Sequence, residues 1–527
     1  MMRINIIGAG LAGLSAALTL AEKGISCRLI SAQHSERAQS VLAEGGINAA
    51  LDTMGENDSV SLHFEDTMKG GVMLADPNAV KALTDNAPAV VRKLAALGVP
   101  FNRNPDGSIM LRSFGGQKKK RTAFVRSSTG KMIMTALIDG VRKYEAKGLV
   151  ERLPHHTLIR LLTEGDKCTG VRIRDEHSDA LTDLAGEVIL AYGGLNGFFP
   201  DMTTGTVTNN GTAAAVLFCQ GVKFANLEMI QYHPTTFGIP GKRCLVSEAA
   251  RGEGGRLFVT KDGAKRYFME EKYPELGNLM PRDVVSREMF FEQREGGETY
   301  LDMTGIPEEV WNGKLSDLRE EIMHYSPLDP KVEPVSVRPA IHYFMGGISV
   351  DIQHRTNLSG LYAAGECACQ YHGANRLGGN SMLGAVFGGM TAANTASGQL
   401  SDTVGKDIPF NGEEEYDCVS SPAFDRSLGE ILIQGLGIVR CGESIRKALE
   451  GLKKLECANS AEQARKSLAE AMLLSALTRE ESRGAHYRED FPAPSETMRK
   501  TAAAEYAGGK VMITLEDITE LKNDDQI

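Results

Sequence analysis

Residues 3–13 read RINIIGAGLAG, a short β-branched run that passes directly into a glycine-rich turn. Apolar residues then recur at helical spacing from Leu11 to Leu18, Gly24 ends the helix, and residues 25–30 supply a second strand. This is a βαβ unit of the usual ~30 residues. Its glycines let the backbone approach a pyrophosphate at a helix N-terminus, so the segment predicts a dinucleotide site, for NAD or FAD.

The strand-to-glycine pattern returns twice, at Val188–Gly194 and at Gly360–Glu366. Between them, residues 227–342 are rich in proline and predict a separate, loop-rich cap. After an acidic linker near residues 413–417, small and apolar residues at i+4 steps predict a helical end. We therefore expect an α/β protein. Its predicted parts are a doubly wound, Rossmann-like nucleotide-binding domain over 1–228 and 343–404, an inserted α+β capping domain over 229–342, and a helical C-terminal domain over 405–527.

Composition excludes several classes of protein. The 527 residues allow roughly three to four domains, and 42% hydrophobic with 24% charged residues is typical of globular chains rather than disordered or fibrous ones. A net charge of −10 does not favour binding to nucleic acid or an anionic membrane.

The spacing of the cysteines and of the apolar residues indicates the cellular compartment in which the protein is expected. The nine cysteines are scattered without a Cys-x-x-Cys pair, which favours free thiols in a reducing compartment and no metal or iron–sulfur site. Neither a basic leader nor a run of about 18 apolar residues occurs, so we expect a cytoplasmic protein without direct membrane insertion.

Four segments hold the residue types that would bind a small dicarboxylate: residues 231–236 (QYHPTT), 281–285 (PRDVV), 341–343 (IHY) and 372–376 (HGANR). Arginine can bind a carboxylate through two parallel charge-assisted hydrogen bonds, while histidine and threonine add directional donors. The set is chemically coherent if the fold brings the four segments together.

The order and spacing of these segments resemble the flavoprotein family of fumarate reductase, succinate dehydrogenase and L-aspartate oxidase. The resemblance covers nearly the whole chain. Its motifs are GAGLAG at Gly8, AEGGINAA at Ala43, HPTT at His233, SEAARGEGG at Ser247, PRDVV at Pro281, IHYFMGGI at Ile341, GLYAAGE at Gly360, HGANRLGGNS at His372 and ESRGAHYREDFP at Glu481.

The resemblance favours FAD over NAD as the cofactor, and it implies a role for each matching residue. The cofactor-binding residues it implies are Gly8, Gly10, Gly13, Ser31, Glu44, Gly45, Gly46, Gly193, Gly194, Glu366, Ser381 and Leu383. The substrate-binding residues it implies are His233, Thr235, Ser247, His342, Arg376, Phe114 and Gln117. Arg282 matches the catalytic arginine, and Glu248 with Arg251 matches the proton path that would return a proton to it.

Three positions depart from the family pattern. Gln39 stands where covalently flavinylated members carry a histidine, so we expect FAD to be non-covalent. Glu44 stands where those members carry glutamine, and an ionised carboxylate there would lower the flavin potential. Asn210 replaces an aspartate.

Residues 112–130 bear on the substrate. L-aspartate oxidases meet the substrate ammonium with an acid in this region, but the segment contains no Asp or Glu, and Phe114 and Gln117 match the succinate and fumarate branch. Met345 and the Gly378-Gly379 pair favour the same branch. We therefore predict reduction of fumarate to succinate, a C4 dicarboxylate reaction, by an FAD-dependent enzyme. The alternatives are an L-aspartate oxidase, or a flavoprotein subunit whose partner is an iron–sulfur or other electron-donor protein.

Overall fold

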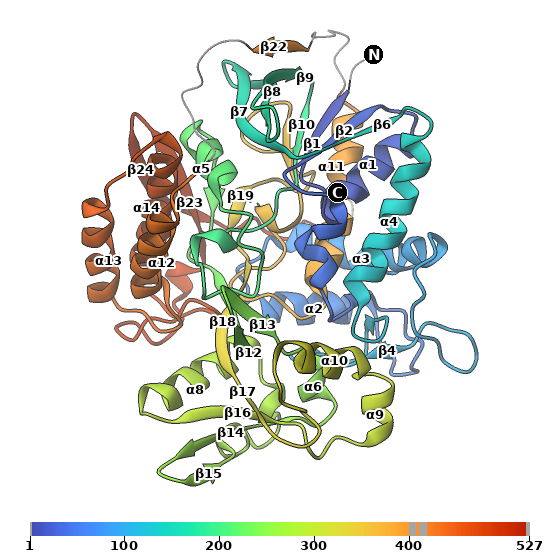
Figure 1. Ribbon diagram of the computed structural model, residues 1–527, viewed down its shortest axis with the longest axis vertical. Coiled ribbons are helices and arrows are strands. Elements are labelled where there is room, and N and C mark those ends of the chain that lie inside the picture. Colours follow the sequence, from blue (N-terminus) through green and yellow to red (C-terminus); the bar gives the residue numbers. More distant parts are fainter. Residues whose placement is uncertain (1–2, 400–406, 411–418, 523–527) are drawn as a thin grey trace.

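The computed structural model describes residues 3–399, 407–410 and 419–522, and its centre is a five-stranded parallel sheet (Figure 1). The strands run in the order β20-β10-β1-β2-β6, with bounds Leu361–Ala363, Val188–Leu190, Ile4–Ile7, Cys27–Ser31 and Val150–Pro154. Strands from both ends of the predicted insertion thus share one sheet. The carboxyl ends of parallel strands meet at one edge, where α/β folds bind nucleotides.

Helix α1 (Leu11–Glu22) packs against α11 (Asn380–Ser397) and α4 (Thr129–Glu145). Every residue of α1 up to Ala21 is buried, which explains its lack of a polar face. A methyl group on Gly389 would lie 2.2 Å from the carbonyl oxygen of Ala12. The crossing of α1 and α11 therefore requires a glycine, and it fixes the N-terminal turn against the late part of the chain.

The insertion forms the lobe at the bottom of Figure 1 and has its own hydrophobic core. Its sheets are β13-β12-β18 and β15-β14-β16-β17, with bounds Lys242–Leu245, Ile230–Ile239, Arg338–Phe344, Ala264–Arg266, Arg256–Lys261, Glu298–Asp302 and Val335–Ser336. Its helices are α6 (Glu248–Gly252), α7 (Phe268–Lys272), α8 (Arg282–Arg294), α9 (Glu308–Asn312) and α10 (Ser316–Tyr325). This is the α+β cap that the sequence predicts.

The C-terminal part contains three helices, α12 (Pro422–Leu436), α13 (Gly442–Lys454) and α14 (Ser460–Thr478). A hairpin follows, β23 (Lys500–Ala507) and β24 (Lys510–Asp517). The hairpin extends the sheet β21-β19-β11-β23-β24, whose other strands are Ala368–Cys369, Gly347–Ser349 and Phe224–Ala225. The end of the chain is thus helical with an added hairpin. The predicted boundary at 404/405 and the acidic linker lie outside the described residues.

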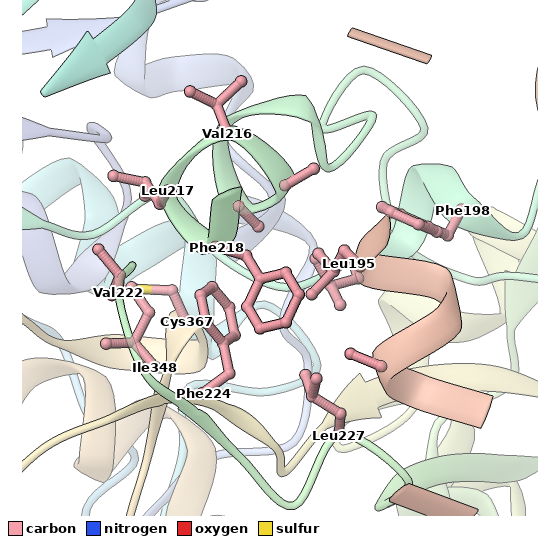
Figure 2. Packing of buried hydrophobic residues seen from close by; sticks show 14 of the residues in the cluster. Leu195, Phe198, Val216, Leu217, Phe218, Val222, Phe224, Leu227, Ile348 and Cys367 are labelled. Atoms are coloured by element: carbon pink, nitrogen blue, oxygen red, sulfur yellow. The ribbon is translucent and has the colours of Figure 1, made fainter. Parts of the chain in front are cut away.

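One hydrophobic cluster joins the C-terminal helices to the sheet domain. Figure 2 shows Phe218 of α5 (Thr212–Cys219) against Phe224, with their ring centroids 5.6 Å apart and the rings perpendicular. Leu195, Leu227 and Cys367 lie around them, and α14 packs on α5. This packing holds the C-terminal helices against the same scaffold that carries the nucleotide-binding strands.

The described ranges add three observations on cysteines, metal groups and membrane spans. Eight cysteines lie there, and none forms a disulfide. No group of three or more His, Cys, Asp and Glu side chains in this part of the chain is arranged to hold a metal ion. Among the helices of residues 3–399 and 419–522, none combines the length and apolar character needed to cross a membrane.

Candidate active site

A single cavity of about 770 Å3 runs from the carboxyl ends of β1, β2 and β10 to the underside of the cap. Most of the predicted site residues line it. They are Gly8, Gly10, Ser31, Glu44, Gly45, Gly46, Phe114, Gly193, Gly194, His233, Ser247, Glu248, Arg282, His342, Glu366, Arg376 and Ser381. Residues remote in sequence therefore converge on one space, with the glycines at one end and the histidines and arginines at the other.

The glycine end is built from backbone. Gly8 has φ +114°, and a side-chain carbon there would lie 2.1 Å from the carbonyl oxygen of Ala191. The first N–H groups of α1 start directly after this turn, where a helix offers unpaired donors and a positive dipole end. These features fit the pyrophosphate of a dinucleotide.

A second set of close approaches lies further along the cavity. A side-chain carbon on Gly45 would meet the ring of Phe114 at 3.0 Å, and one on Gly194 would meet the Glu366 carboxylate at 2.4 Å. Glu366 accepts a hydrogen bond from the backbone N–H of Phe344 (3.1 Å). Burial raises the pKa of Glu366 to about 7. This wall thus presents backbone and one weakly acidic carboxyl to a ligand.

The residues near the predicted flavin position fit a non-covalent FAD. Gln39 lines the cavity, and its buried Oε1 has no hydrogen-bond partner among the described residues. An amide cannot attack the flavin methyl group as a histidine ring nitrogen can. Ser31 donates its hydroxyl proton to the carbonyl oxygen of Gln33 (2.6 Å), so its oxygen keeps acceptor capacity for a ribose hydroxyl.

The surroundings of Glu44 oppose the ionisation on which the predicted lowering of the flavin potential depends. Burial, together with the charge and hydrogen bond of Glu321 on α10, raises the pKa of Glu44 well above its ordinary value. Its carboxyl therefore keeps its proton to a higher pH than an exposed carboxyl does, whereas the predicted electrostatic effect required an ionised group. The cap carboxyl that causes this shift is remote in sequence and was not among the predicted site residues.

Arg282 is the first residue of α8 and lies buried against Glu248. Its Nε and Nη2 are 2.8 Å and 2.6 Å from Oε2 of Glu248, whose Oε1 accepts from the backbone N–H of Gly115 (3.0 Å). Arg251 Nη2 lies 3.8 Å from the same Oε1. Burial by itself would raise the pKa of Glu248, but the charges of Arg282 and Arg251 lower it below the ordinary value.

The two predicted histidines lie together, with ring centroids 5.1 Å apart. Burial and the positive charge of Arg282 lower the pKa of both well below 6.5, so each ring is neutral. His233 Nδ1 accepts from the backbone N–H of Thr235 (3.3 Å), which leaves Nε2–H as its donor. His342 Nδ1 lies 2.8 Å from Thr204 Oγ1. The pair offers neutral donors to an anion.

Arg376 completes this end of the cavity. Its guanidinium lies over the ring of Tyr343, 4.3 Å from the centroid, and Nη2 donates to Gln231 Oε1 (2.9 Å). Its buried Nε has no hydrogen-bond partner among the described residues. Burial and the nearby charge of Arg282 lower the pKa of Arg376 to about 9. A bound anion would stabilise both positive charges.

Five predicted residues lie behind the cavity wall: Gly13, Gln117, Thr235, Arg251 and Leu383. Three of them contact a residue of the wall: Gly13 lies against Gly8, Thr235 donates its backbone N–H to His233, and Arg251 lies beside Glu248. A side-chain carbon on Gly13 would lie 1.9 Å from the carbonyl oxygen of Gly8. Thr235 donates to the carbonyl oxygen of Val246 (2.8 Å), Gln117 donates to that of Gly378 (2.7 Å), and Leu383 is a core residue of α11. The sequence resemblance could not separate contact with a ligand from support of a contacting residue.

The fold and the geometry agree with comparisons to known proteins. Residues 4–382 match the family described as FAD binding domain, and residues 463–522 match the family described as fumarate reductase flavoprotein C-term. The first match spans the sheet domain and the cap, and the second begins within α14 and includes the hairpin.

Relatives of two kinds are similar over almost their full length. The chain is 36% identical to the succinate dehydrogenase flavoprotein subunit of Bacillus subtilis, over 93% of this chain and 91% of that protein. It is 34% identical to an L-aspartate oxidase of Mesorhizobium japonicum, over 92% and 91%. A solved E. coli quinol fumarate reductase chain superposes with a TM-score of 0.88 at 28% identity, covering 99% of this chain and 97% of that chain.

Proposed function

Because the chain belongs to the FAD-dependent family of succinate dehydrogenase and fumarate reductase flavoproteins and L-aspartate oxidase, we propose that it reduces fumarate to succinate. One observation carries the proposal. Two buried guanidinium groups, those of Arg282 and Arg376, face the same cavity as the glycine-rich end that fits FAD. A small dianion beside the flavin is the ligand that this arrangement would stabilise.

The residues of the cap end would bind and orient the substrate. Arg376 pairs with one carboxylate of fumarate, while the neutral rings of His233 and His342 donate to carboxylate oxygens. Ser247 is the N-cap of α6, and its Oγ accepts from the backbone N–H of Ala249 (3.4 Å). Its hydroxyl proton provides a further polar contact at the wall. The cap covers the substrate and excludes water.

Arg282 would hold the proton that the reaction needs. The glycine end of the cavity and Phe114 would hold FAD, whose reduced form would supply the hydride that adds to one alkene carbon. Arg282 donates a proton to the neighbouring carbon, which balances the two-electron reduction. A free guanidinium is a poor acid. Glu248, however, accepts a hydrogen bond from Arg282 Nε, forms an ion pair with Arg282 Nη2 and lies next to Arg251, so it can pass a replacement proton to Arg282.

An anaerobic titration of the oxidised, FAD-loaded protein with L-aspartate tests the substrate. We expect the flavin absorption to remain that of the oxidised form, and we expect chemically reduced protein to be reoxidised promptly by fumarate. Bleaching by L-aspartate would overturn the proposal and make the protein an aspartate-oxidising enzyme.

L-aspartate oxidase is the second candidate, and one observation favours it. The carboxyls of Glu44 and Glu321 both line the cavity beside Ser247, where they could accept a substrate ammonium although residues 112–130 contain no acid. Glu44→Gln separates the two substrates. If L-aspartate is the substrate, the KM for L-aspartate rises in this variant while fumarate binding is retained. If the protein is a fumarate reductase, L-aspartate bleaches the flavin of neither the wild type nor the variant.

The electron donor is a separate proposal. One relative is named a flavoprotein subunit of succinate dehydrogenase, so we propose that an iron–sulfur or similar electron-transfer protein docks on this chain. Co-purification of an iron-containing protein from the native source is the expected result. A homogeneous chain that reduces fumarate at full rate with a small soluble donor would argue against an obligatory partner.

A further inference from the structure

We propose that Gln231 is a positioning residue that holds Arg282 and Arg376 at a fixed separation across the boundary between the cap and the flavin domain. The inference rests on the proposed function, because both arginines are assigned there to the substrate. Gln231 is the second residue of β12 and is fully buried. Its amide contacts both guanidinium groups.

All the hydrogen-bonding capacity of this amide is used. Its Oε1 accepts from Arg376 Nη2 (2.9 Å) and from Arg282 Nη1 (3.2 Å). Its Nε2 donates to Asn375 Oδ1 (2.8 Å) and to the backbone carbonyl of Arg376 (2.9 Å). A side-chain amide offers two acceptor lone pairs and two N–H donors, so one orientation satisfies four partners. The opposite orientation would place NH2 against two cations and oxygen against two oxygens.

The acceptor side addresses an electrostatic problem. Two guanidinium groups close together repel, and the charge of Arg282 is one cause of the lowered pKa of Arg376. One oxygen that accepts from both reduces the repulsion without adding a net negative charge. A carboxylate at the same place would neutralise part of the potential that attracts the substrate dianion.

The donor side of the amide links the cap strand β12 to residues 375–376 of the flavin domain. Asn375 accepts from Gln231 and in turn donates Nδ2 to Asp283 Oδ1 (3.1 Å), the residue after Arg282 on α8. The chain of contacts therefore runs from Asp283 of the cap to Asn375 of the flavin domain, back to Gln231 of the cap, and on to Arg376.

Gln231 acts through the arginines and not on the substrate. Within the described ranges the cavity is lined by Arg282 and Arg376, whereas Gln231 and Asn375 lie behind them. Sequence placed Gln231 in a candidate segment but gave it no role, because only the structure shows the two guanidinium groups on one oxygen.

Two variants of similar volume test this role. Gln231→Leu removes the shared acceptor but keeps both positive charges, so we expect kcat for fumarate to fall about 10- to 100-fold with a smaller change in KM. Gln231→Glu keeps an acceptor but adds a negative charge, so we expect KM for fumarate, and the dissociation constant of malonate, to rise about 10- to 100-fold. Malonate binding is read from the flavin absorption of the oxidised protein.

Gln370→Leu and Gln370→Glu are the matched controls. Gln370 is also buried and lies near the same segment, but it donates to His354 (2.8 Å) and does not contact either arginine. We expect the two Gln370 variants to resemble each other in kcat and in KM, and both to differ less from the wild type than the Gln231 variants do. FAD occupancy and the thermal midpoint of each variant show whether it is folded.

The proposal fails if the two Gln231 variants give the same KM-against-kcat pattern, or if the Gln370 pair reproduces it. Failure of the proposed function looks different, because the wild type would then not reduce fumarate at all. In that case malonate binding still decides the role of Gln231. Binding weakened in Gln231→Glu and retained in Gln231→Leu supports it, and equal binding by both variants overturns it.

Discussion

The two ends of the cavity are built in opposite ways. At the FAD end the contacts are made by backbone, because glycines such as Gly8 and Gly194 leave no room for a side chain. At the cap end the contacts are made by charged side chains, above all Arg282 and Arg376, which hydrogen bonds hold in place. One end is thus defined by shape, and the other by a network of charges.

This difference predicts how each end fails. At the FAD end the glycine backbone lies too close to its neighbours for a side-chain carbon to fit. Small substitutions there therefore act on cofactor binding and folding. A charge network can lose one member while the flavin remains bound, so substitutions at the cap end act on turnover. The comparison breaks if the two kinds of substitution have the same effect.

Arg282 gives the largest expected effect. Arg282→Lys keeps the charge but loses the paired contacts to Glu248, and we expect kcat for fumarate reduction to fall about 10²–10⁴-fold, the range for loss of a general acid. FAD occupancy should stay near that of the wild type. Arg294→Ala, at the exposed end of the same helix where it pairs with Glu489, is the control and should retain turnover. Near-normal turnover in Arg282→Lys would remove the assigned role.

Gly8→Ala tests the opposite end. The substitution places a carbon against the Ala191 carbonyl at φ +114°, and the backbone strain alone costs about 1–3 kcal/mol. We expect reduced FAD content after purification and a lower thermal midpoint, with the remaining loaded fraction turning over normally. Gly24→Ala is the control, because a side-chain carbon at Gly24 would meet nothing within 4 Å although φ is +75°. Full FAD content in Gly8→Ala would contradict the role of this glycine turn in binding FAD.

The same contrast explains what sequence could predict. The FAD end follows from residues 3–30, since strand, turn and helix are neighbours in the chain and the glycine spacing has a local cause. The sheet assignment and the presence of a cap also follow from local patterns. Segment order and the family resemblance gave the rest of the glycine set.

The cap end depends on contacts between distant segments, which no local pattern encodes. Gln231 was visible as a residue type, but its position between two arginines depends on how β12 meets residues 375–376. Glu44 illustrates the same limit. Its predicted effect required an ionised carboxyl, and Glu321, which together with burial raises the pKa of Glu44, lies 277 positions later in the sequence.

Glu44→Gln sharpens the comparison through pH. The folded-state pKa of Glu44 is raised above its ordinary value of 4.5 by burial and by Glu321. The folded protein therefore binds this proton more tightly than the unfolded chain, and stability falls as pH rises above the ordinary pKa. Glutamine has no proton to lose, so the variant should gain thermal midpoint relative to wild type at pH 8 more than at pH 5. Glu456→Gln, at an exposed position, is the control, and an equal difference at both pH values would refute the shift.

Asn210→Asp gives the smallest expected effect and tests whether a departure from the family pattern matters at the backbone-built end. Asn210 Oδ1 accepts from the backbone N–H of Thr212 (2.9 Å) at the start of α5, and an aspartate oxygen can accept the same bond. The added charge lies at a helix N-terminus, where it stabilises by about 0.3–1 kcal/mol. We expect a slightly higher thermal midpoint and a change in FAD affinity well below that of Gly8→Ala. A large loss of FAD would mean that side-chain charge, and not only backbone shape, governs cofactor binding at this end, and the contrast between the two ends would no longer hold.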